Sequence, residues 1–467
     1  MKFAIAILAA GKGTRLKSKR PKVLHAIGGQ PLLEHVIHAA SQIVEPSDIY
    51  VIIGHEADSV RAAVEHTGVR FVVQAEQRGT GHAIQELRSS LLEGDKPRYD
   101  QLLVLSGDVP LIRPETIAQV RDFHAAQNAA MTILTAVLPD ATGYGRVIRR
   151  SSDSPEVAAI VEQKALTNEQ RSLKEINSGI YAFSLAPLLA HVSQLTTANA
   201  HAEYYLTDMA ALLVAAAERV VAVPADDAAE VLGANTIREM MLLDRAMRLR
   251  TAEKLMADGV TIFRPETTVI DASVEVAADA VIEPFVQLLG KTRVGADTVI
   301  RSYSVLRNVQ VGEGVLIRNS CVAEDSIIAN GAQIGPFAHL RPGSQIGENA
   351  HVGNFVETKK ARLGKGAKAN HLAYLGDADV GDNTNVGAGV ITCNYDGIHK
   401  HPTTIGANVF VGSDSTLVAP LTIGDGAYIA AGSSITEDVP ADALALGRSR
   451  QITKPDWAKK RRETRRN

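Results

Sequence analysis

The chain has 467 residues, which is enough for two large domains or three of about 150 residues each. Its 49 Lys and Arg residues nearly balance 52 Asp and Glu residues, so the net charge of −3 gives no reason to expect nucleic acid or an anionic membrane as a partner. Two cysteines exclude both a disulfide framework and a cysteine-rich metal site. The apolar start runs directly into Gly11-Lys12, and no apolar stretch approaches the ~18 residues of a membrane span, so we expect a cytoplasmic protein.

Short apolar segments alternate with helical ones in the first half of the chain. The expected strands are 3–8, 49–53, 69–73, 102–105 and 131–137, and helical spacing of apolar residues marks 32–40 and 79–92. Strands that alternate with helices in this way are typical of βαβ units. We therefore predict an α/β domain with a parallel sheet and helices on both faces.

A glycine-containing loop follows the first expected strand. Backbone amides around Gly11 can approach phosphate oxygens, and loops at the carboxyl ends of parallel strands are where α/β folds bind ligands. The loop is neither a Walker loop nor a Rossmann fingerprint, because Leu16 occupies the place of the last glycine of that fingerprint. Arg15 and Lys22 lie close enough in the sequence for both to face a polyphosphate.

An acidic residue follows the strand expected at 102–105. Asp108 would lie at the carboxyl end of that strand, opposite the glycine-containing loop. A carboxylate in this position is well placed to hold Mg²⁺. The alternative is an aspartate that only caps a turn, and the neighbouring phosphate loop argues against it.

A helix start follows the first region. Thr236 and Glu239 have the spacing of a capping box, in which each side chain binds a backbone amide that the helix leaves free. Apolar residues continue at roughly helical spacing as far as Gly259, which stops the helix. This pattern predicts a long linker helix over 236–259.

From Val276 onward, an aliphatic residue recurs at every sixth position. The first run is Val276, Ile282, Leu288, Val294, Ile300 and Leu306, and the spacing returns in 334–352 and 405–435. A small or branched residue lies four positions after each of the first five, at Ala280, Val286, Thr292, Thr298 and Ser304. This period predicts a parallel β-helix of triangular section, with one hexapeptide per face. The alternative, a chance pattern in a valine-rich β-sandwich, does not account for two separate runs at fixed spacing.

The six-residue spacing is interrupted twice, between 358 and 369 and between 383 and 404. Insertions in a solenoid form protruding loops, often on the binding face. We therefore expect two such loops, with a second functional site beside them.

The end of the chain is basic. Residues 458–467 contain Lys459, Lys460, Arg461, Arg462, Arg465 and Arg466 against one glutamate. Two interpretations remain open, a solvated and disordered tail or a cationic patch for a phosphorylated ligand.

The motifs LAAGKGTRL, PKVLH, QAEQRGTGHA, GDVPL, GYGRVI and INSGIY, followed by the hexapeptide half, occur in this order along nearly the whole chain. With them the sequence resembles the bacterial family of bifunctional N-acetylglucosamine-1-phosphate uridyltransferase / glucosamine-1-phosphate N-acetyltransferase. The resemblance implies a Rossmann-like uridylyltransferase (pyrophosphorylase) domain over 1–235, the linker helix over 236–259, a left-handed parallel β-helix acetyltransferase domain over 260–455 and the basic tail over 456–467.

The resemblance also implies two reactions. The β-helix would acetylate glucosamine 1-phosphate with acetyl-CoA, and the first domain would then transfer UMP from UTP to N-acetylglucosamine 1-phosphate and release pyrophosphate. The product, UDP-N-acetylglucosamine, feeds peptidoglycan, lipopolysaccharide and other cell-envelope synthesis. Mg²⁺ is the implied cofactor. The implied assembly is a homotrimer formed through the β-helix, with acetyl-CoA sites between neighbouring subunits and with neither nucleic acid nor a membrane as partner.

Matching positions give the site residues that the resemblance implies for the first domain. The loop that binds uridine and phosphate falls on Leu8, Ala9, Ala10 and Gly11, and Arg15 and Lys22 would contact the phosphates. The uracil would lie against Gln74, Gly79 and Thr80, and the sugar against Gly145, Glu162 and Asn177. Asp108 and Asn235 would bind Mg²⁺, with Ser106 and Gly107 beside the metal. An amide and backbone groups suit uracil, whose edge offers both donors and acceptors. Ser106 departs from the family, because some members have Tyr there.

The second reaction needs a group that takes a proton from the attacking amine, and histidine is the usual choice near neutral pH. His371 lies between the two interruptions and matches the family's base, with Tyr374 as the next candidate. Most histidines are surface or structural residues, and this interpretation stays with His339, His351, His399 and His401. The resemblance further places sugar phosphate on Arg341, Lys359, Tyr374 and Asn385, and acetyl-CoA on Ala388, Asn394, Tyr395, Ser413, Ala431 and Arg448.

Two other functions compete with this one. The β-helix could be a structural or regulatory module of a nucleotidyltransferase, but a purely structural prism would not need His371 between two loops. The chain could instead be a non-enzymatic assembly subunit of the same ancestry. Retention of Lys22, Asp108 and Asn235 argues against that role.

Overall fold

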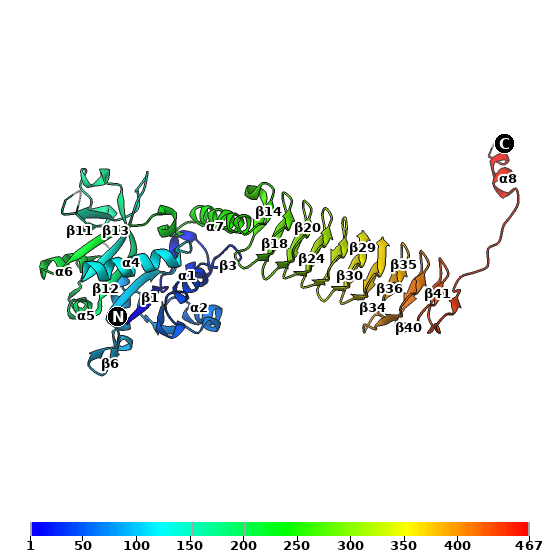
Figure 1. Ribbon diagram of the computed structural model, residues 1–467, viewed down its shortest axis with the longest axis horizontal. Coiled ribbons are helices and arrows are strands. Elements are labelled where there is room, and N and C mark those ends of the chain that lie inside the picture. The colour runs from blue at the N-terminus through cyan, green and yellow to red at the C-terminus, as the bar shows by residue number, and fades with distance from the viewer. Residues whose placement is uncertain (1, 152–153, 200–201, 466–467) are drawn as a thin grey trace. The chain divides into compact units, whose positions relative to one another are not determined.

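The computed structural model describes residues 2–151, 154–199 and 202–465 (Figure 1). The chain forms two compact units, residues 1–247 and residues 248–467. Each unit has its own hydrophobic core and is described by itself.

The first unit is built on one mixed sheet, in which the strand order is β11-β10-β12-β8-β1-β4-β5, and β9 pairs with β12 and β13. The strands are β1 Phe3–Leu8, β4 Ile49–Ile53, β5 Arg70–Val73, β8 Gln101–Ser106, β9 Met131–Val137, β10 Arg146–Arg149, β11 Val157–Val161, β12 Glu175–Ser184 and β13 Val220–Pro224. Strand β1 runs parallel to β4 and β8, as predicted, but β12 is antiparallel to β8 and β9. The expected parallel sheet is therefore confirmed for β1, β4, β5 and β8, whereas the sheet as a whole is mixed because β12 returns beside β8 in the opposite direction.

Helices cover both faces of this sheet, as predicted. They are α1 Leu32–Ser41, α2 Ala57–Val64, α3 Thr80–Leu87, α4 Pro114–Gln127, α5 Leu185–His191 and α6 Asp208–Ala215. Side chains alternate along β1, so Ile5 and Ile7 pack with α1, α2 and α4, while Ala4 and Ala6 lie on the face covered by α3, α5 and α6. Both layers are buried, which fixes the edge from which the loops after the strands emerge.

The helix expected over 79–92 ends earlier. It stops at Leu87 and continues as the 3₁₀ turn η5 Arg88–Leu91, because the chain then enters the short hairpin of β6 Leu92–Glu93 and β7 Lys96–Pro97. A second small hairpin, β2 Ala26–Ile27 with β3 Gln30–Pro31, precedes α1.

Helix α7, Ile237–Ala257, spans the division between the two units. Its start has the predicted capping box: the Glu239 carboxylate accepts from the backbone N–H groups of Asn235 at 2.8 Å and Thr236 at 3.1 Å, and the Thr236 hydroxyl oxygen accepts from the Glu239 N–H at 3.2 Å. Past its end, Gly259 adopts a left-handed φ of 96°.

The second unit is a stack of coils whose short strands form three parallel sheets, one for each face of a triangular prism (Figure 1). The first sheet contains β14 Thr261–Ile262, β17 Val281–Ile282, β20 Val299–Ile300, β23 Leu316–Ile317, β26 Gln333–Ile334, β29 His351–Asn354, β32 Lys368–His371, β35 Asn385–Val386, β38 Phe410–Val411, β41 Tyr428–Ile429 and β43 Leu444–Ala445. The second contains β15 Val269–Ile270, β18 Gln287–Leu289, β21 Val305–Arg307, β24 Val322–Glu324, β27 His339–Leu340, β30 Glu357–Lys359, β33 Tyr374–Gly376, β36 Ile391–Cys393, β39 Thr416–Val418 and β42 Ser434–Ile435. The third contains β16 Glu275–Val276, β19 Arg293–Val294, β22 Gln310–Val311, β25 Ile327–Ile328, β28 Gln345–Ile346, β31 Arg362–Leu363, β34 Ala378–Val380, β37 Thr403–Ile405 and β40 Leu421–Ile423.

The predicted repeat accounts for the interior of the prism. The recurring aliphatics stack in the core, and Ile300 lies in register between Ile282 and Ile317 of the neighbouring coils. The small residues four positions later are also fully buried. Thr292 shows why a hydroxyl is tolerated there, because its Oγ1 donates to the Leu289 carbonyl at 2.7 Å. The hexapeptide β-helix is confirmed.

The two predicted interruptions have different outcomes. Between 358 and 369 no loop protrudes, because the chain takes only five residues from Thr358 to Leu363, and β31 and β32 remain in register. A coil of 17 residues in place of 18 therefore looked like an insertion, and that prediction is wrong. The second interruption contains a real insertion, residues 394–402, between β36 and β37.

Near its end the chain forms the short helix α8, Trp457–Glu463, whose described side chains are exposed. It includes the basic residues Lys459 to Arg462 of the predicted tail, whereas Arg466 lies outside the described residues. Within the described ranges, none of the helices is both long and apolar enough to cross a bilayer.

Helix α4 contains a buried histidine, and its burial should make the stability of the first unit depend on pH. His124 is 1% exposed and hydrogen-bonds with the hydroxyls of Thr132 at 2.8 Å and Ser184 at 3.3 Å. Burial lowers the pKa of His124 from its usual 6.5 to about 4. The unfolded chain then takes up this proton first as pH falls, so the associated stability is fully present above about pH 6.5 and is lost progressively toward pH 4.

We expect this loss to reach about 2 kcal/mol at pH 5, at about 1.4 kcal/mol per pKa unit. The variant His124→Gln cannot be protonated, so its melting temperature should fall less than that of the wild type between pH 7.5 and pH 5. The exposed His66 provides the matched control, His66→Gln, which should keep the wild-type fall. An equal fall in His124→Gln and wild type would contradict the prediction.

Candidate active sites

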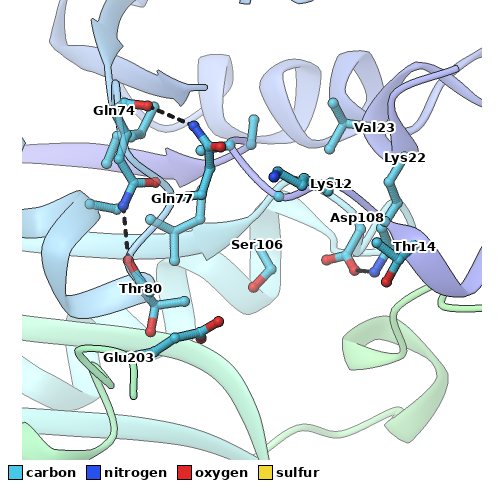
Figure 2. Close-up of a pocket in the computed structure, with 18 residues that line it drawn as sticks. Lys12, Thr14, Lys22, Val23, Gln74, Gln77, Thr80, Ser106, Asp108 and Glu203 are labelled. Atoms are coloured by element: carbon cyan, nitrogen blue, oxygen red, sulfur yellow. Dashed lines mark hydrogen bonds and ion pairs between the residues drawn. The ribbon is translucent and has the colours of Figure 1, made fainter. Parts of the chain in front are cut away.

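In the first unit, a cavity of about 560 Å³ opens at the carboxyl end of β1. It is lined by Leu8 to Thr14, Lys22, Val23, Ile52, Gln74, Gln77, Gly79, Thr80, Ala83, Ser106, Asp108 and Glu203. Figure 2 shows Gln74, Gln77 and Thr80 at one end, and Thr14, Lys22 and Asp108 at the other. The cavity thus has an end rich in amide groups and an end rich in charge.

Most of the residues assigned to nucleotide binding meet in this cavity. They are Leu8, Ala9, Ala10, Gly11, Lys22, Gln74, Gly79, Thr80, Ser106 and Asp108. Gly107 lies between two lining residues, and its N–H donates to the Leu8 carbonyl at 2.9 Å, which ties β8 to β1 at the floor. Arg15 and Asn235 do not line the cavity itself but hydrogen-bond to each other beside its charged end.

The amide-rich end is held by side chain to backbone bonds. The buried Gln74 donates from Nε2 to the Gly79 carbonyl at 3.0 Å. Gly79 has a φ of 109°, and a Cβ there would lie 2.5 Å from the Tyr204 carbonyl oxygen, so only glycine fits under this neighbouring loop. The Thr80 hydroxyl oxygen in turn accepts from the Leu206 N–H at 3.0 Å. The segment that would read a base is therefore fixed before any ligand binds.

The charged end centres on Lys22. A Cβ on Gly13 would lie 2.6 Å from the Lys22 Cβ, so the left-handed glycine lets the loop close over this lysine. The Lys22 ammonium group forms an ion pair with Asp108 and donates to Asn235 Oδ1 at 2.8 Å. Arg15 donates to the same Asn235 oxygen at 2.7 Å. Two cations thus meet one carboxylate and one amide oxygen.

These contacts test whether Asp108 and Asn235 could share a metal ion. One cation, the Lys22 ammonium group, already bonds to oxygens of both residues, so both oxygens can converge on a single positive centre. Carboxylate and amide oxygens are ligands that Mg²⁺ accepts. The described residues contain no group of three or more His, Cys, Asp or Glu side chains that could hold a metal, so further ligands would have to come from substrate or water. The two residues fit the predicted role.

The three residues assigned to the sugar form a separate group in the same unit. The Asn177 N–H donates to the Gly145 carbonyl at 2.9 Å, and the Gly145 backbone faces the Glu162 carboxylate, which would lie 3.5 Å from a Cβ there. A Cβ on Gly179, two residues after Asn177, would lie 3.3 Å from the Ser106 hydroxyl. This close approach connects the group to the rim of the cavity.

Sequence reasoning did not select four polar residues of the cavity, Lys12, Thr14, Gln77 and Glu203. Lys12 and Thr14 lie in the glycine-containing loop itself, beside the residues that were selected. Gln77 lies within the motif that supplied Gln74 and donates to the Gln74 carbonyl at 3.0 Å, so its motif was a usable signal. Glu203 comes from a distant segment and reaches the cavity only because the Gly81 N–H and the Arg78 carbonyl hold its neighbour Tyr204. No local pattern announces such a residue.

In the second unit, five of the assigned residues follow one edge of the prism. The backbone carbonyls of three of them accept from the next coil: His371 from Gly389 at 3.4 Å, Ala388 from Asp414 at 2.8 Å and Ser413 from Gly432 at 2.8 Å. Ala431 precedes Gly432, and a Cβ on that glycine would lie 3.9 Å from the Arg448 side chain. With ~4.8 Å between coils, His371 and Arg448 lie ~19 Å apart along this edge, which suits a long, extended ligand.

His371 is exposed at the end of β32 and is oriented by a neighbour. Its Nδ1 hydrogen-bonds with Asn354 Oδ1 at 2.7 Å, and the two residues are in register in adjacent coils. A carboxamide oxygen only accepts, so Nδ1 carries the proton and Nε2 keeps a free lone pair. This is the tautomer that a proton acceptor needs. Asn354 was not found from the sequence, because no motif marks it.

A cluster of cations lies on the second sheet. Arg341 donates to Glu357 Oε1 at 2.8 Å, and Lys359 ends β30, in register with Gly376 of β33. The Lys400 amino group, through a hydrogen bond and its charge, lowers the pKa of Lys359, and Arg341 adds to this effect. Three neighbouring cations, with the carboxylates of Glu357 and Asp377 beside them, could hold an anion. Lys400 was missed because it comes from the insertion rather than from a repeat.

The insertion 394–402 is organised by Asp396. Its carboxylate accepts from the N–H groups of Ile398 at 2.7 Å and His399 at 2.6 Å, and from His401 Nε2 at 2.8 Å. These bonds, with the His399 amide first, lower the pKa of Asp396 to about 2. The structural interpretation of His399 and His401 agrees with these contacts.

The remaining assigned residues lie on two faces of the prism. Asn394 begins the insertion and donates to Asp377 Oδ2 at 2.5 Å, and the Tyr395 hydroxyl donates to the Gly397 carbonyl at 2.6 Å. Tyr374 belongs to β33 on the second sheet, whereas Asn385 belongs to β35 on the first sheet, with His371. One chain therefore does not gather all four sugar-phosphate residues on one face.

Comparisons with known proteins agree with both halves. Residues 5–254 match the MobA-like NTP transferase domain, and residues 325–360 and 402–437 match the bacterial transferase hexapeptide (six repeats). The bifunctional protein GlmU of Koribacter versatilis (strain Ellin345) is 60% identical over 462 residues, which cover 99% of this chain and 97% of that protein. The protein of the same name from Anaeromyxobacter sp. (strain Fw109-5) is 48% identical, over 98% of this chain and 93% of its own length. The one from Streptococcus agalactiae serotype V (strain ATCC BAA-611 / 2603 V/R) is 45% identical, over 97% of this chain and 97% of its own length. Near full-length identity at this level, with both domain types in the same order, shows that the chain belongs to the family of the bifunctional protein GlmU.

Proposed function

We propose that the chain makes UDP-N-acetylglucosamine in two steps, one in each unit. Residues 260–455 would acetylate glucosamine 1-phosphate with acetyl-CoA, and residues 1–235 would join N-acetylglucosamine 1-phosphate to UTP with release of pyrophosphate, with 236–259 as linker and 456–467 as tail. Membership of a family of bifunctional transferases supports the pair of activities. The observation that supports the residue assignment most is that defined contacts already hold the assigned polar side chains in each unit, Lys22 with Asp108 and Asn235 in the first and His371 with Asn354 in the second.

In the uridylyl step, Gln74, Gly79 and Thr80 would orient the uracil at the amide-rich end of the cavity. The backbone amides of the loop after β1, with Arg15 and Lys22, would hold the triphosphate at the charged end. A phosphate oxygen of the sugar phosphate would attack the α-phosphorus of UTP in line, and pyrophosphate would leave. The chain contributes position and positive charge rather than a covalent bond to the substrate.

A divalent metal ion is the general requirement of nucleotidyltransferases of this kind, and Mg²⁺ is the proposed one. Asp108 and Asn235 would hold it, and when bound it would neutralise charge on the phosphate oxygens. Lys22 would then exchange its contacts with these two residues for contacts with phosphate oxygens. Arg15, freed in the same way from Asn235, would face the leaving pyrophosphate.

In the acetyl step, the amine nitrogen of glucosamine 1-phosphate would attack the thioester carbonyl of acetyl-CoA. The new C–N bond forms as the C–S bond breaks, and His371 Nε2 would take the amine proton and return it to the departing CoA thiolate or to water. Asn354 keeps the imidazole in the required tautomer. Arg341, Lys359 and Lys400 would bind the sugar phosphate, whose charge relieves their mutual repulsion.

We also propose that the β-helix forms a homotrimer. The separation of Tyr374 and Asn385 on two faces of one prism supports a site completed by a neighbouring copy, with Ala388, Asn394, Tyr395, Ser413, Ala431 and Arg448 binding acetyl-CoA at the shared edge. A cytoplasmic location accords with the use of UTP and acetyl-CoA.

The metal assignment makes a prediction about Asp108→Asn. The substitution keeps the size of the side chain but removes the charge that would hold Mg²⁺. We expect uridylyl transfer, followed as pyrophosphate release, to fall by ~10²-fold or more, while CoA thiol release in the acetyl step is unchanged. The exposed Asp122 gives a control, Asp122→Asn, which should retain both activities. Uridylyl transfer by the wild type that survives EDTA would show the metal assignment to be wrong.

The assignment of His371 makes the opposite prediction. His371→Ala should lower acetyl transfer by ~10²–10⁴-fold, the usual contribution of a general base, and should leave uridylyl transfer unchanged. Asn354→Ala should lower acetyl transfer less, by ~10-fold, through loss of orientation.

A neighbouring histidine controls for this experiment. His351 lies on β29, one coil before His371, and His351→Gln should keep acetyl transfer near the wild-type rate. If His371→Ala kept full activity, another group would take the proton, and Tyr374 would be tested next. The wild type could instead show no acetyl activity, while Asp108→Asn still loses uridylyl transfer. That pair of results would support a structural role for the β-helix.

A further inference from the structure

The first unit contains a buried carboxylate that the proposed mechanism does not use. Glu230 lies in the 3₁₀ turn η9, Ala228–Val231, and is 1% exposed. Its oxygens accept from Arg113 Nε at 2.5 Å and from the Thr116 hydroxyl at 2.5 Å, and the Arg113 backbone N–H adds a bond of 3.3 Å at the start of α4. Burying an unpaired carboxylate is costly, so the three donors fix the position of this side chain closely.

Glu230, Arg113 and Thr116 form a clamp, and its place along the chain connects it to the proposed metal residues. Arg113 lies five residues after Asp108, and Glu230 lies five residues before Asn235. Between the clamp and these two side chains the segments stay together, since the Ala234 N–H donates to the Asp108 carbonyl at 3.2 Å. A Cβ on Gly233 would lie 3.1 Å from the Asp108 carboxylate, so this glycine allows the close approach.

We propose that Glu230 is a positioning residue for the uridylyl site, which holds Asn235 opposite Asp108 so that the pair is arranged for one divalent cation before the cation binds. The inference rests on the proposed metal role of Asp108 and Asn235. The capping box anchors Asn235 from the helix side through Glu239, and the clamp anchors the same segment from the other side. Residues that orient metal ligands typically change metal affinity by about 10–100-fold when they are replaced.

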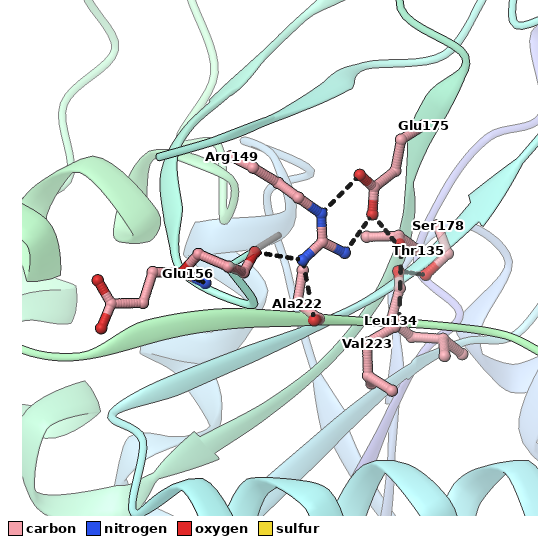
Figure 3. Close-up of polar contacts among 9 residues, drawn as sticks. Leu134, Thr135, Arg149, Glu156, Glu175, Ser178, Ala222 and Val223 are labelled. Carbon is pink, nitrogen blue, oxygen red and sulfur yellow. Dashed lines mark hydrogen bonds and ion pairs between the residues drawn. The ribbon is translucent and has the colours of Figure 1, made fainter. Parts of the chain in front are cut away.

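The same unit offers a matched control of the same chemistry. Figure 3 shows that Glu175 accepts from the Arg149 guanidinium and from the Thr135 hydroxyl. The two guanidinium bonds are 2.6 and 2.8 Å long, and the hydroxyl bond is 2.7 Å long. This second Arg-Glu-Thr group joins β9, β10 and β12 within the sheet. Replacing Glu175 removes contacts similar to those of Glu230 but does not involve the segments that lead to Asp108 or Asn235.

The experiment compares Glu230→Gln and Glu230→Ala with Glu175→Gln in the full-length chain. Binding of Mn²⁺ in the presence of UTP, followed by the electron paramagnetic resonance signal of the free ion, reports metal affinity without turnover. We expect the dissociation constant for Mn²⁺ to rise about 10-fold or more in the Glu230 variants, with a parallel rise in the Mg²⁺ concentration for half-maximal uridylyl transfer. Glu175→Gln should bind Mn²⁺ as the wild type does, even where its melting temperature is lower.

A double variant separates positioning from stability. In Arg113→Met/Glu230→Leu the buried Glu230 carboxylate and its half-exposed partner Arg113 are replaced together by apolar side chains, so that neither charge is left without its partner. We expect this variant to regain the melting temperature of the wild type but to keep the weak Mn²⁺ binding, because apolar contacts do not fix the segment in the same register. Thr116→Val, which removes one bond and is the mildest change, should raise the dissociation constant by a few-fold.

Two results would overturn the inference, and both can be distinguished from a failure of the proposed metal site. Wild-type Mn²⁺ affinity in the Glu230 variants, with loss of binding in Asp108→Asn, would refute the clamp and leave the metal site in place. Recovery of Mn²⁺ affinity together with stability in the double variant would make Glu230 merely structural. Unchanged binding in Asp108→Asn as well would refute the metal site itself.

Discussion

Parallel pairing of strands is the constraint on which both candidate sites depend. In the first unit, β1, β4 and β8 end at the same edge of the sheet, so the loops that follow them meet there. In the second unit, parallel stacking places residues of successive coils in line along one edge. Distance along the sequence then hardly matters: Lys22 and Asn235 are 213 residues apart and share a hydrogen bond, as do His371 and Asn354 at a separation of 17.

Both sites also gather positive charge that the protein must accommodate without ligand. In the first unit the charge is balanced in part, because Lys22 pairs with Asp108, whereas Arg15 bonds only to the neutral amide oxygen of Asn235. In the second unit it is balanced less well, and the lowered pKa of Lys359 records the repulsion from Lys400 and Arg341. A phosphate bound there would reduce that repulsion.

The sequence predicted those features that repeat or that lie in a local motif. The hexapeptide period revealed the prism, because every sixth residue points into the core, and the motifs around Gly11, Gln74 and Asp108 supplied most of the cavity lining. The shortened coil near Thr358 was mistaken for a loop, since a missing residue and an inserted one break a period alike. The antiparallel β12 could not be recognised, because strand direction leaves no trace in a single segment. The individual roles assigned to the site residues stay predictions.

Three of the residues that sequence reasoning missed share one physical property. Glu230, Asn354 and Lys400 contact partners from other coils or segments, such as Arg113 for Glu230 at a separation of 117 residues. Neither spacing nor composition near such a residue differs from that of an ordinary surface position. Only the folded structure shows that Glu230 is buried and that three donors converge on it.

The two units hold their site residues in different ways, and the difference follows from how far the backbone ladder extends. In the prism, each residue of the edge is fixed by hydrogen bonds to the coils before and after it, so His371 needs only Asn354 to set its ring. The loops of the first unit lie beyond the ends of the strands, where no such ladder continues, and carboxylates take its place: Glu239 holds the amide of Asn235, and Glu230 holds the segment before it. The insertion of the second unit obeys the same rule, because it leaves the coils and is closed by Asp396. In these three places, where backbone pairing ends beside a candidate site, a buried or well-bonded carboxylate supplies the missing acceptors.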